Sequence, residues 1–179
     1  SKHSAIILHD GTGSCWVGAS SPLNKNIKYG SKVRVTGTTY VDSSYLANIR
    51  GATAEYLGEG SIPEPRVARA EDLFAKWIDT QWIQMEALVV GTEEDGLAFT
   101  LVLDIAGKIF KADVPFEPDS EKRAAVLMQR RVLFTGVAST VVNGSRQMTD
   151  RHFLIPSFDQ IIPIKTKTSE VPPPFRKIA

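Results

Sequence analysis

The sequence has one cysteine, three histidines and no long apolar run, and each shortage excludes a class of site or segment. With Cys15 alone, neither an internal disulfide nor a cysteine-based four-ligand zinc site can form. His3, His9 and His152 are too few to build a histidine-rich metal centre. No apolar stretch approaches the ~18 residues that a membrane-spanning helix requires. We therefore expect no metal site in this chain.

Excess charge of either sign is also missing. The 21 Lys and Arg residues are scattered and nearly balance the 20 Asp and Glu residues, which gives a formal net charge of +1. A dedicated nucleic-acid binder usually has a clustered basic face, so this distribution counts against DNA or RNA as the partner. Apolar residues make up 42% of the chain, which is enough to bury a core.

An internal repeat is the strongest feature that the sequence does contain. Residues 8–17 align with residues 102–111: in each segment an apolar strand reaches an aspartate, Asp10 or Asp104, and a glycine and a second strand follow. Aspartate accepts hydrogen bonds from turn amides, and glycine supplies the positive φ of a tight turn. Both segments are therefore predicted to form β-hairpins.

The repeat continues beyond the hairpins. Residues 33–37 match residues 132–136, and each match is followed by another β-prone run. Before this match the second copy has a helix-forming segment within Glu117–Arg131, where the first copy has only the shorter Ser21–Lys32. The predicted closing strands are residues 46–57 in the first copy and 153–164 in the second.

The second copy also has a leading strand, residues 82–90, whose counterpart in the first copy would fall before residue 1. Three strands, a short helix and two strands are the order of the OB fold, a five-stranded Greek-key barrel. We predict an all-β protein, mainly β with short helices, with two tandem OB-like barrels of which the first lacks its leading strand. Because the chain starts without an initiator Met or a signal-peptide pattern, we expect a processed or excised fragment.

Glycine and proline set the expected boundaries. The paired Gly and Pro residues of 58–65 interrupt the strands, and a short helix is predicted near residues 70–77. The chain is thus divided into an OB-like unit 1 that is incomplete at its N-terminus (1–65), a linker with a short helix (66–79), an OB-like unit 2 (80–165) and a Pro-rich tail (166–179).

Motifs for catalysis are weak. The Asp10–Gly13 segment resembles a phosphate loop, but it lacks the Gly-Lys-Ser/Thr ending and leads into a strand. No serine lies in a nucleophile-elbow pattern. We therefore expect no catalytic residue, no cofactor and no enzymatic activity in this chain.

Single-stranded nucleic acid is the alternative ligand, because OB barrels often bind it on stacked aromatic side chains and a basic groove. In the first unit such a ligand-binding face could comprise Trp16, Tyr40, Tyr45 and Arg50. The second unit has Phe110 and Lys111 but no stacking pair. This alternative would place the protein in the cytoplasm, and the scattered charge makes nucleic acid the less favoured partner.

Three segments carry a resemblance to a known family: residues 57–66, residues 72–73 and Asp79–Val89 with its Asp-x-Gln-Trp motif. They resemble the OB-like tandem region upstream of the membrane and kinase parts of certain bacterial sensor histidine kinases. Ala87 stands where that family has glycine. The resemblance spans nearly the whole chain and brings no known set of ligand-binding residues.

The resemblance implies a sensory or interaction region of a membrane-bound two-component signalling protein. Its location would be periplasmic, and parts outside this chain would provide the membrane tether and the histidine kinase core. The partner would be an unknown small molecule or protein. No kinase motif lies in residues 1–179, so kinase activity is not expected of these residues.

Overall fold

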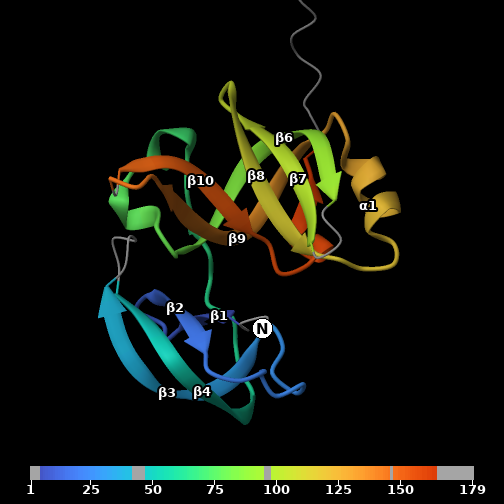
Figure 1. Cartoon of the computed structure of the whole chain (residues 1–179). Coiled ribbons are helices and arrows are strands. Elements are labelled where there is room, and N and C mark those ends of the chain that lie inside the picture. Colours follow the sequence, from blue (N-terminus) through green and yellow to red (C-terminus); the bar gives the residue numbers. More distant parts are fainter. Residues whose placement is uncertain (1–4, 42–46, 95–97, 146, 165–179) are drawn as a thin grey trace, which may run out of the picture.

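The computed structural model describes residues 5–41, 47–94, 98–145 and 147–164. They form two β units, one above the other in Figure 1, which one crossing segment joins. Strands make up most of both units, and the helices are short. The predicted all-β fold with OB-like units is therefore confirmed. Two stretches with predictions, Tyr45 with its neighbours and the Pro-rich tail 166–179, lie outside the described residues.

The first unit is a sheet of four strands: β1 (Ala5–His9), β2 (Ser14–Ala19), β3 (Ser31–Val41) and β4 (Ala47–Glu59). Their order in the sheet is β1-β2-β4-β3. β1 and β2 form an antiparallel hairpin, β2 lies parallel to β4, and β3 is antiparallel to β4.

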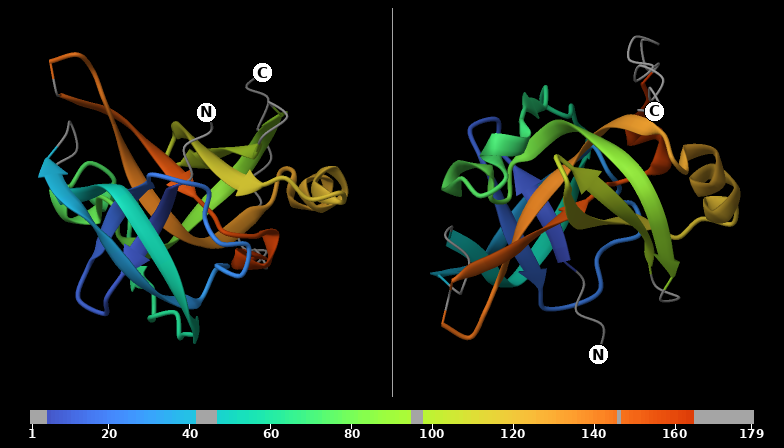
Figure 2. Two further views of the ribbon diagram at one scale, coloured as in Figure 1. Left: turned by 60° about the horizontal axis from the view of Figure 1, so that its bottom comes forward. Right: turned by 90° about the horizontal axis from the view of Figure 1, so that it is seen from above.

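The second unit is a closed barrel, and two 3₁₀ helices, η1 (Ala70–Asp72) and η2 (Lys76–Ile78), lie between its short first strand and the strands that follow. It comprises β5 (Arg66–Val67), β6 (Trp82–Glu94), β7 (Ala98–Ile105), β8 (Lys108–Pro115), α1 (Ser120–Leu127), β9 (Arg131–Val142), β10 (Met148–Leu154), η3 (Phe158–Gln160) and β11 (Ile161–Pro163). β6 pairs with both β7 and β9, which closes the barrel. The β9–β10 hairpin projects beyond it (Figure 2).

The two units share one topology. In the second unit β7 and β8 form a hairpin, β8 lies parallel to β10, and β9 is antiparallel to β10. These relations repeat those of β1, β2, β3 and β4 in the first unit. β6 has no counterpart among the described residues of the first unit. The units are therefore an OB-like barrel and an OB-like sheet without its leading strand.

The aspartates that mark the repeat act alike in the two hairpins. Asp10 Oδ1 accepts a hydrogen bond from the Gly13 amide at 3.1 Å, and Asp104 Oδ1 accepts one from the Gly107 amide at 2.7 Å. In the first hairpin the positive φ belongs to Gly11, at 94°, and not to the aligned Gly13.

The structure corrects the alignment of the first hairpin by one residue. Leu8 pairs with Cys15 in the first unit as Leu103 pairs with Phe110 in the second. Trp16 therefore corresponds to Lys111 and points away from the barrel interior, because neighbouring side chains of a strand alternate between its faces. The aspartate–glycine pattern alone could not fix this register, since a shift by one residue preserves the turn but exchanges the faces.

Glycines at matching positions of β3 and β9 have one physical role. A Cβ added to Gly37 would lie 2.6 Å from Ile49 Cγ2 and 3.0 Å from the Arg50 carbonyl oxygen. A Cβ added to Gly136 would lie 2.8 Å from the Leu154 carbonyl oxygen. β3 approaches β4, and β9 approaches β10, so closely at these positions that only glycine fits.

Two predicted elements differ from the structure. The closing strand of the second copy is β10, which precedes most of the predicted segment 153–164; after η3 the chain pairs again with the same edge of β9 as β11, because β6 occupies the other edge. The predicted linker helix is the pair of 3₁₀ helices η1 and η2, and Leu73 between them packs into the core.

The second unit has the larger core. Every member of the main hydrophobic cluster comes from residues 68–161, and it includes the edge-to-face ring pair Phe134–Phe153, with centroids 5.0 Å apart. In the first unit the described buried hydrophobic side chains are Val17, Ala19 and Ala52. The first unit thus leaves much of the apolar interior of its sheet partly exposed.

Candidate ligand groove between the two units

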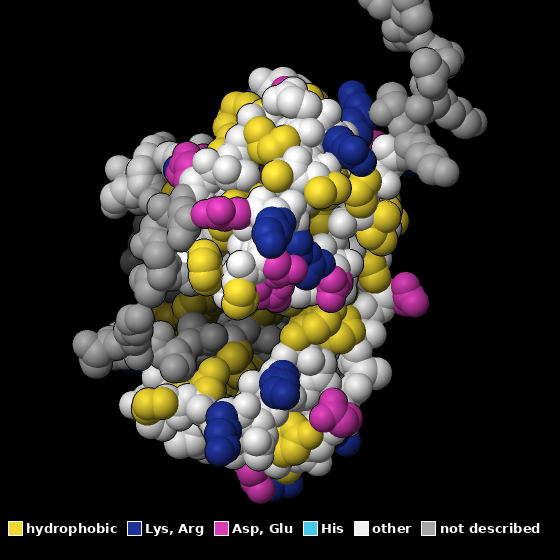
Figure 3. All heavy atoms as spheres, turned by 90° about the vertical axis from the view of Figure 1, so that its right-hand side faces the viewer, with side chains coloured by type: hydrophobic (Ala, Val, Ile, Leu, Met, Phe, Trp, Pro, Cys, Tyr) yellow, Lys and Arg dark blue, Asp and Glu magenta, His cyan; other side chains and the backbone are white. Residues whose placement is uncertain are grey.

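A groove of about 1340 Å³ lies between the units, and both contribute to its walls. Seen from the side in Figure 3, hydrophobic side chains gather along the hollowed junction between the upper and the lower unit. The first unit supplies β1, the loop before β3 and the start of β3; the second supplies the start of β6, the end of β8 and the segment after β10. A ligand in this groove would contact both units at once.

The wall from the first unit is largely aliphatic. Ile6 and Leu8 of β1 and Val33 of β3 line the groove, and each is half-buried. The crossing segment continues this wall, since Ile62 and Pro63 also line the groove. The wall from the second unit includes Trp82, Val114, Pro115, Val137, Leu154, Ile155 and Pro156.

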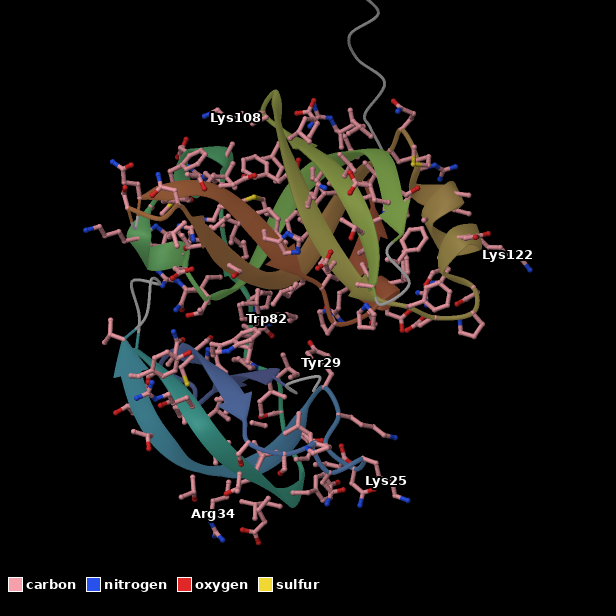
Figure 4. All side chains as sticks on the ribbon, in the orientation of Figure 1. Lys25, Tyr29, Arg34, Trp82, Lys108 and Lys122 are labelled. Carbon is pink, nitrogen blue, oxygen red and sulfur yellow. The ribbon has the colours of Figure 1, made fainter. Side chains whose placement is uncertain are left out.

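Tyr29 and Trp82 meet across the junction (Figure 4). Their ring centroids are 5.8 Å apart with an interplanar angle of 47°. Trp82 is 8% exposed, whereas Tyr29 is 50% exposed. Burial raises the pKa of the Tyr29 hydroxyl above its ordinary value of 10.0. A hydrogen bond of 3.2 Å from the Thr80 hydroxyl to the Ser14 carbonyl oxygen joins the units near this pair.

Two buried polar atoms in this region have no hydrogen-bond partner among the described residues: Trp82 Nε1 and Ser14 Oγ. Both residues line the groove. Buried polar groups are normally paired, so each exception calls for an explanation. The junction thus holds an indole N–H donor and a hydroxyl group that no described residue satisfies.

Charged groups lie at the edges of the groove. Asp113 accepts a hydrogen bond of 2.7 Å from the Thr100 hydroxyl, and its other oxygen lies 2.8 Å from His152 Nε2. On the facing wall Lys28 and Lys32 are exposed. The groove thus combines an apolar floor with charges of both signs, which is typical of small-molecule and peptide sites.

The site residues predicted from sequence lie elsewhere. The Arg50 guanidinium stacks over the Tyr40 ring at 5.2 Å. Tyr40 pairs in register with Asn48, whose side-chain oxygen accepts a hydrogen bond of 3.3 Å from the Trp16 amide. The structure thus brings Trp16, Tyr40 and Arg50 to neighbouring strands of the first unit, and none of them lines the groove. Tyr45 is not among the described residues.

Other candidate residues are less accessible. Phe110 is 1% exposed in the core of the second unit and offers no stacking surface.

Within the described part of the chain, no cluster of three or more His, Cys, Asp and Glu side chains could hold a metal ion. No described helix is long and apolar enough to cross a bilayer.

Sequence comparison adds no relative: no protein-family model and no curated protein matches the chain. Among solved structures, a putative aspartyl-tRNA synthetase from Leishmania major is similar over 57% of this chain at 14% identity, with a TM-score of 0.42. The match spans 21% of the synthetase. An OBody bound to hen egg-white lysozyme is similar over 57% of this chain and 97% of its own, at 13% identity and a TM-score of 0.42.

A murine DNA binding protein bound with double-stranded DNA is similar over 92% of this chain and 86% of its own, at 9% identity and a TM-score of 0.38. Scores of this size describe a loose likeness and assign no function to this chain.

Sequence reasoning missed Tyr29 and Trp82 as groove residues. Tyr29 lies in a loop that has no matching segment in the second copy of the repeat, and Trp82 is predicted only as the first residue of a strand. Their proximity depends on how the two units dock, which no local pattern encodes. Trp82 begins β6 a few residues after η2, and this closeness to the linker was a signal in the sequence that it could lie near the other unit.

Proposed function

We propose that this chain is a non-enzymatic sensory or interaction region of a bacterial membrane-bound signalling protein of the sensor histidine kinase type. Its ligand would bind in the groove between the units. The observation that supports this most is the shared groove with two unpartnered polar atoms at its junction. The resemblance in the linker and in the Asp-x-Gln-Trp strand supports the family and a periplasmic location.

The mechanism would be a change in the relative placement of the two units. A ligand shifts such an equilibrium only by its difference in affinity for the two arrangements. A molecule that contacts both walls has this difference, because opening the groove would remove the contacts to one wall. The described contacts across the junction are few, with Tyr29–Trp82 and Thr80–Ser14 the clearest, so modest binding energy would suffice.

A binding screen tests the groove. We would follow the thermal unfolding of the chain with a panel of amino acids, sugars, dicarboxylates and short peptides, and repeat each hit with Trp82→Phe, which keeps the ring but removes the N–H donor. Trp16→Phe, on the outer face of the first unit, is the matched control. Hits that weaken with Trp82→Phe and not with Trp16→Phe support the groove. Compounds whose thermal shift is the same in the wild type and both variants, or a screen without hits, count against the groove.

The membrane and kinase context has its own test. The natural gene should encode a signal anchor upstream of this region and a transmembrane helix followed by a kinase core downstream. If these parts are missing from the gene, the sensor proposal is wrong.

Single-strand binding remains the second candidate, because Arg50 stacks on Tyr40 next to the strand that bears the exposed Trp16. Stacking aromatics with a cation are the elements of such a site. Labelled single-stranded oligonucleotides would be titrated at two salt concentrations. Binding that weakens steeply with salt and depends on Trp16 or Arg50 would favour this function and a cytoplasmic location.

A further inference from the structure

The second unit binds the chain from residue 66 on. β5 pairs in parallel with β6, and the Ala68 amide donates a hydrogen bond of 2.9 Å to the Gln84 carbonyl oxygen. Further along, the Arg151 side chain on β10 donates hydrogen bonds to backbone carbonyl oxygens between η1 and η2. Because the backbone is held at several points, this part of the chain must move together with the second unit.

The first unit holds the chain as far as Ile62. The Gly60 amide donates a hydrogen bond of 2.8 Å to the Gly30 carbonyl oxygen. The approach is close, since a Cβ added to Gly60 would lie 2.9 Å from the same oxygen. Two side-chain carbons of Ile62 lie 3.8 and 3.9 Å from the position that a Cβ on Gly30 would take. The chain therefore leaves the first unit after residue 62.

Three residues, Pro63, Glu64 and Pro65, lie between these two attachments, in the segment that crosses from the lower to the upper unit in Figure 1. They form no hydrogen bond and no ion pair with any described residue. Each proline fixes its own φ, and the residue before a proline is restricted to extended backbone. Few torsion angles can therefore change between the units, and hinges commonly consist of a few such residues.

The junction has interactions that favour closing and others that favour opening. The Tyr29–Trp82 ring contact and the hydrogen bond from Thr80 to Ser14 join the units. Trp82 Nε1 and Ser14 Oγ, however, are buried there without a partner among the described residues. An unpaired buried polar group is unfavourable, so exposure of these two atoms to water would favour an open junction.

We propose that residues 63–65 are a hinge about which the two units turn as rigid bodies to open and close the groove, and that its prolines restrict the range of this motion. Pro63 itself lines the groove. The inference rests on the proposed function in one respect, since the groove is the site that the hinge would regulate. A ligand that contacts both walls would favour the closed arrangement, and a proline-rich connection is stiffer than a flexible tether.

Distances between two spin labels test the hinge without any ligand. In a Cys15→Ser background, Lys25→Cys and Lys122→Cys place one label on each unit. Both lysines are exposed, neither lines the groove, and their side chains point outward in Figure 4. Pulsed electron–electron resonance then gives the distribution of distances between the units.

The width of this distribution should follow the stiffness of residues 63–65. Pro63→Gly with Pro65→Gly should widen it by about twofold or more, because glycine-rich connections behave as flexible coils and proline-rich ones as semi-rigid spacers. Glu64→Pro should narrow it, since it fixes one more φ. The two changes act in opposite directions, so a general loss of structure cannot account for both.

A matched pair of glycines in η1 locates the motion. Ala70→Gly with Glu71→Gly changes two exposed residues of the segment that is bound to the second unit, and it should leave the distances unchanged. Circular dichroism verifies that each variant folds. The proposal is overturned if the η1 glycines widen the distribution as much as those at 63 and 65, or if the latter do not widen it.

The hinge and the proposed function can fail separately. If the distances respond to the substitutions at 63–65 but the thermal screen yields no compound, the proposed function is rejected and the hinge stands. If a compound from the screen depends on Trp82 while the glycines at 63 and 65 leave the distances unchanged, the groove keeps its function and this inference is wrong.

Discussion

The guanidinium of Arg151 lies 3.2 Å from the carboxylate of Asp79, and the two side chains are 0% and 1% exposed. Arg151 Nε also donates to the Leu73 carbonyl oxygen at 2.6 Å, and Nη2 to the Ala75 carbonyl oxygen at 2.8 Å. One buried side chain on β10 thus fixes the linker with η1 and η2 against the second unit. The linker cannot act as a free tether at these residues, because its carbonyls are held by this guanidinium.

Removal of this arginine should destabilise the second unit strongly. Arg151→Met leaves the Asp79 carboxylate buried without its cation, and breaking a buried pair in this way costs about 3–5 kcal/mol. Urea unfolding measures the change. Arg34→Met, at an exposed pair with Glu55 whose atoms are 2.9 Å apart, is the control and should change stability by about 0–1 kcal/mol. Equal effects of the two substitutions would contradict this role for Arg151.

Gly136 should tolerate no side chain, whereas a glycine with open surroundings should tolerate one. Gly136→Ala places a Cβ 2.8 Å from the Leu154 carbonyl oxygen, so β9 and β10 must move apart, at a cost of about 1–3 kcal/mol. Gly144 has nothing within 4 Å of an added Cβ, and Gly144→Ala should stay within about 0.5 kcal/mol. Thermal unfolding measures both. A tolerated Gly136→Ala would show that the close approach of these strands is not required.

The repeat could be recognised in the sequence because the backbone conformation at its turns and close approaches restricts which residues can occupy them. The turn aspartates Asp10 and Asp104 and the close-approach glycines Gly37 and Gly136 have few substitutes at their positions, so they recur where the rest of the sequence diverges. These residues marked the two hairpins and the matching strands of the repeat. They did not fix which face Trp16 occupies, because turn chemistry leaves a one-residue shift open.

The groove could not be predicted in the same way. It forms where two units dock, and Tyr29 and Trp82 are 53 positions apart in the sequence with no periodic pattern to connect them. The buried Arg151 was equally hidden, since a lone arginine in a strand usually marks an exposed face. The Asp79 carboxylate, the Thr140 hydroxyl and the linker carbonyls of Leu73 and Ala75, which local patterns do not bring together, surround the buried guanidinium.

The Tyr29–Trp82 contact should report on the junction. Tyr29→Ala removes a ring pair worth about 0.5–1.5 kcal/mol and opens the groove beside Trp82. In a background with Trp16→Phe and Trp77→Phe, Trp82 is the single tryptophan; its emission should shift to the red, and the indole should become accessible to quenching by iodide. Phe116→Ala removes a ring of the second unit that is 49% exposed, close to the 50% of Tyr29, and should leave the emission unchanged.

The Asp10 carboxyl should titrate far below its ordinary range. The Thr12 hydroxyl, then the Thr12 and Gly13 amides, donate to the charged form and lower the pKa from 3.8 to about 2. A pKa depressed by folding contributes stability above pH 3.8, and this contribution is lost as the pH falls toward 2. Carboxyl chemical shifts against pH measure the midpoint. Thr12→Ala removes the largest cause and should raise it toward 3.8; a wild-type midpoint already near 3.8 would show that this turn does not hold the carboxylate in solution.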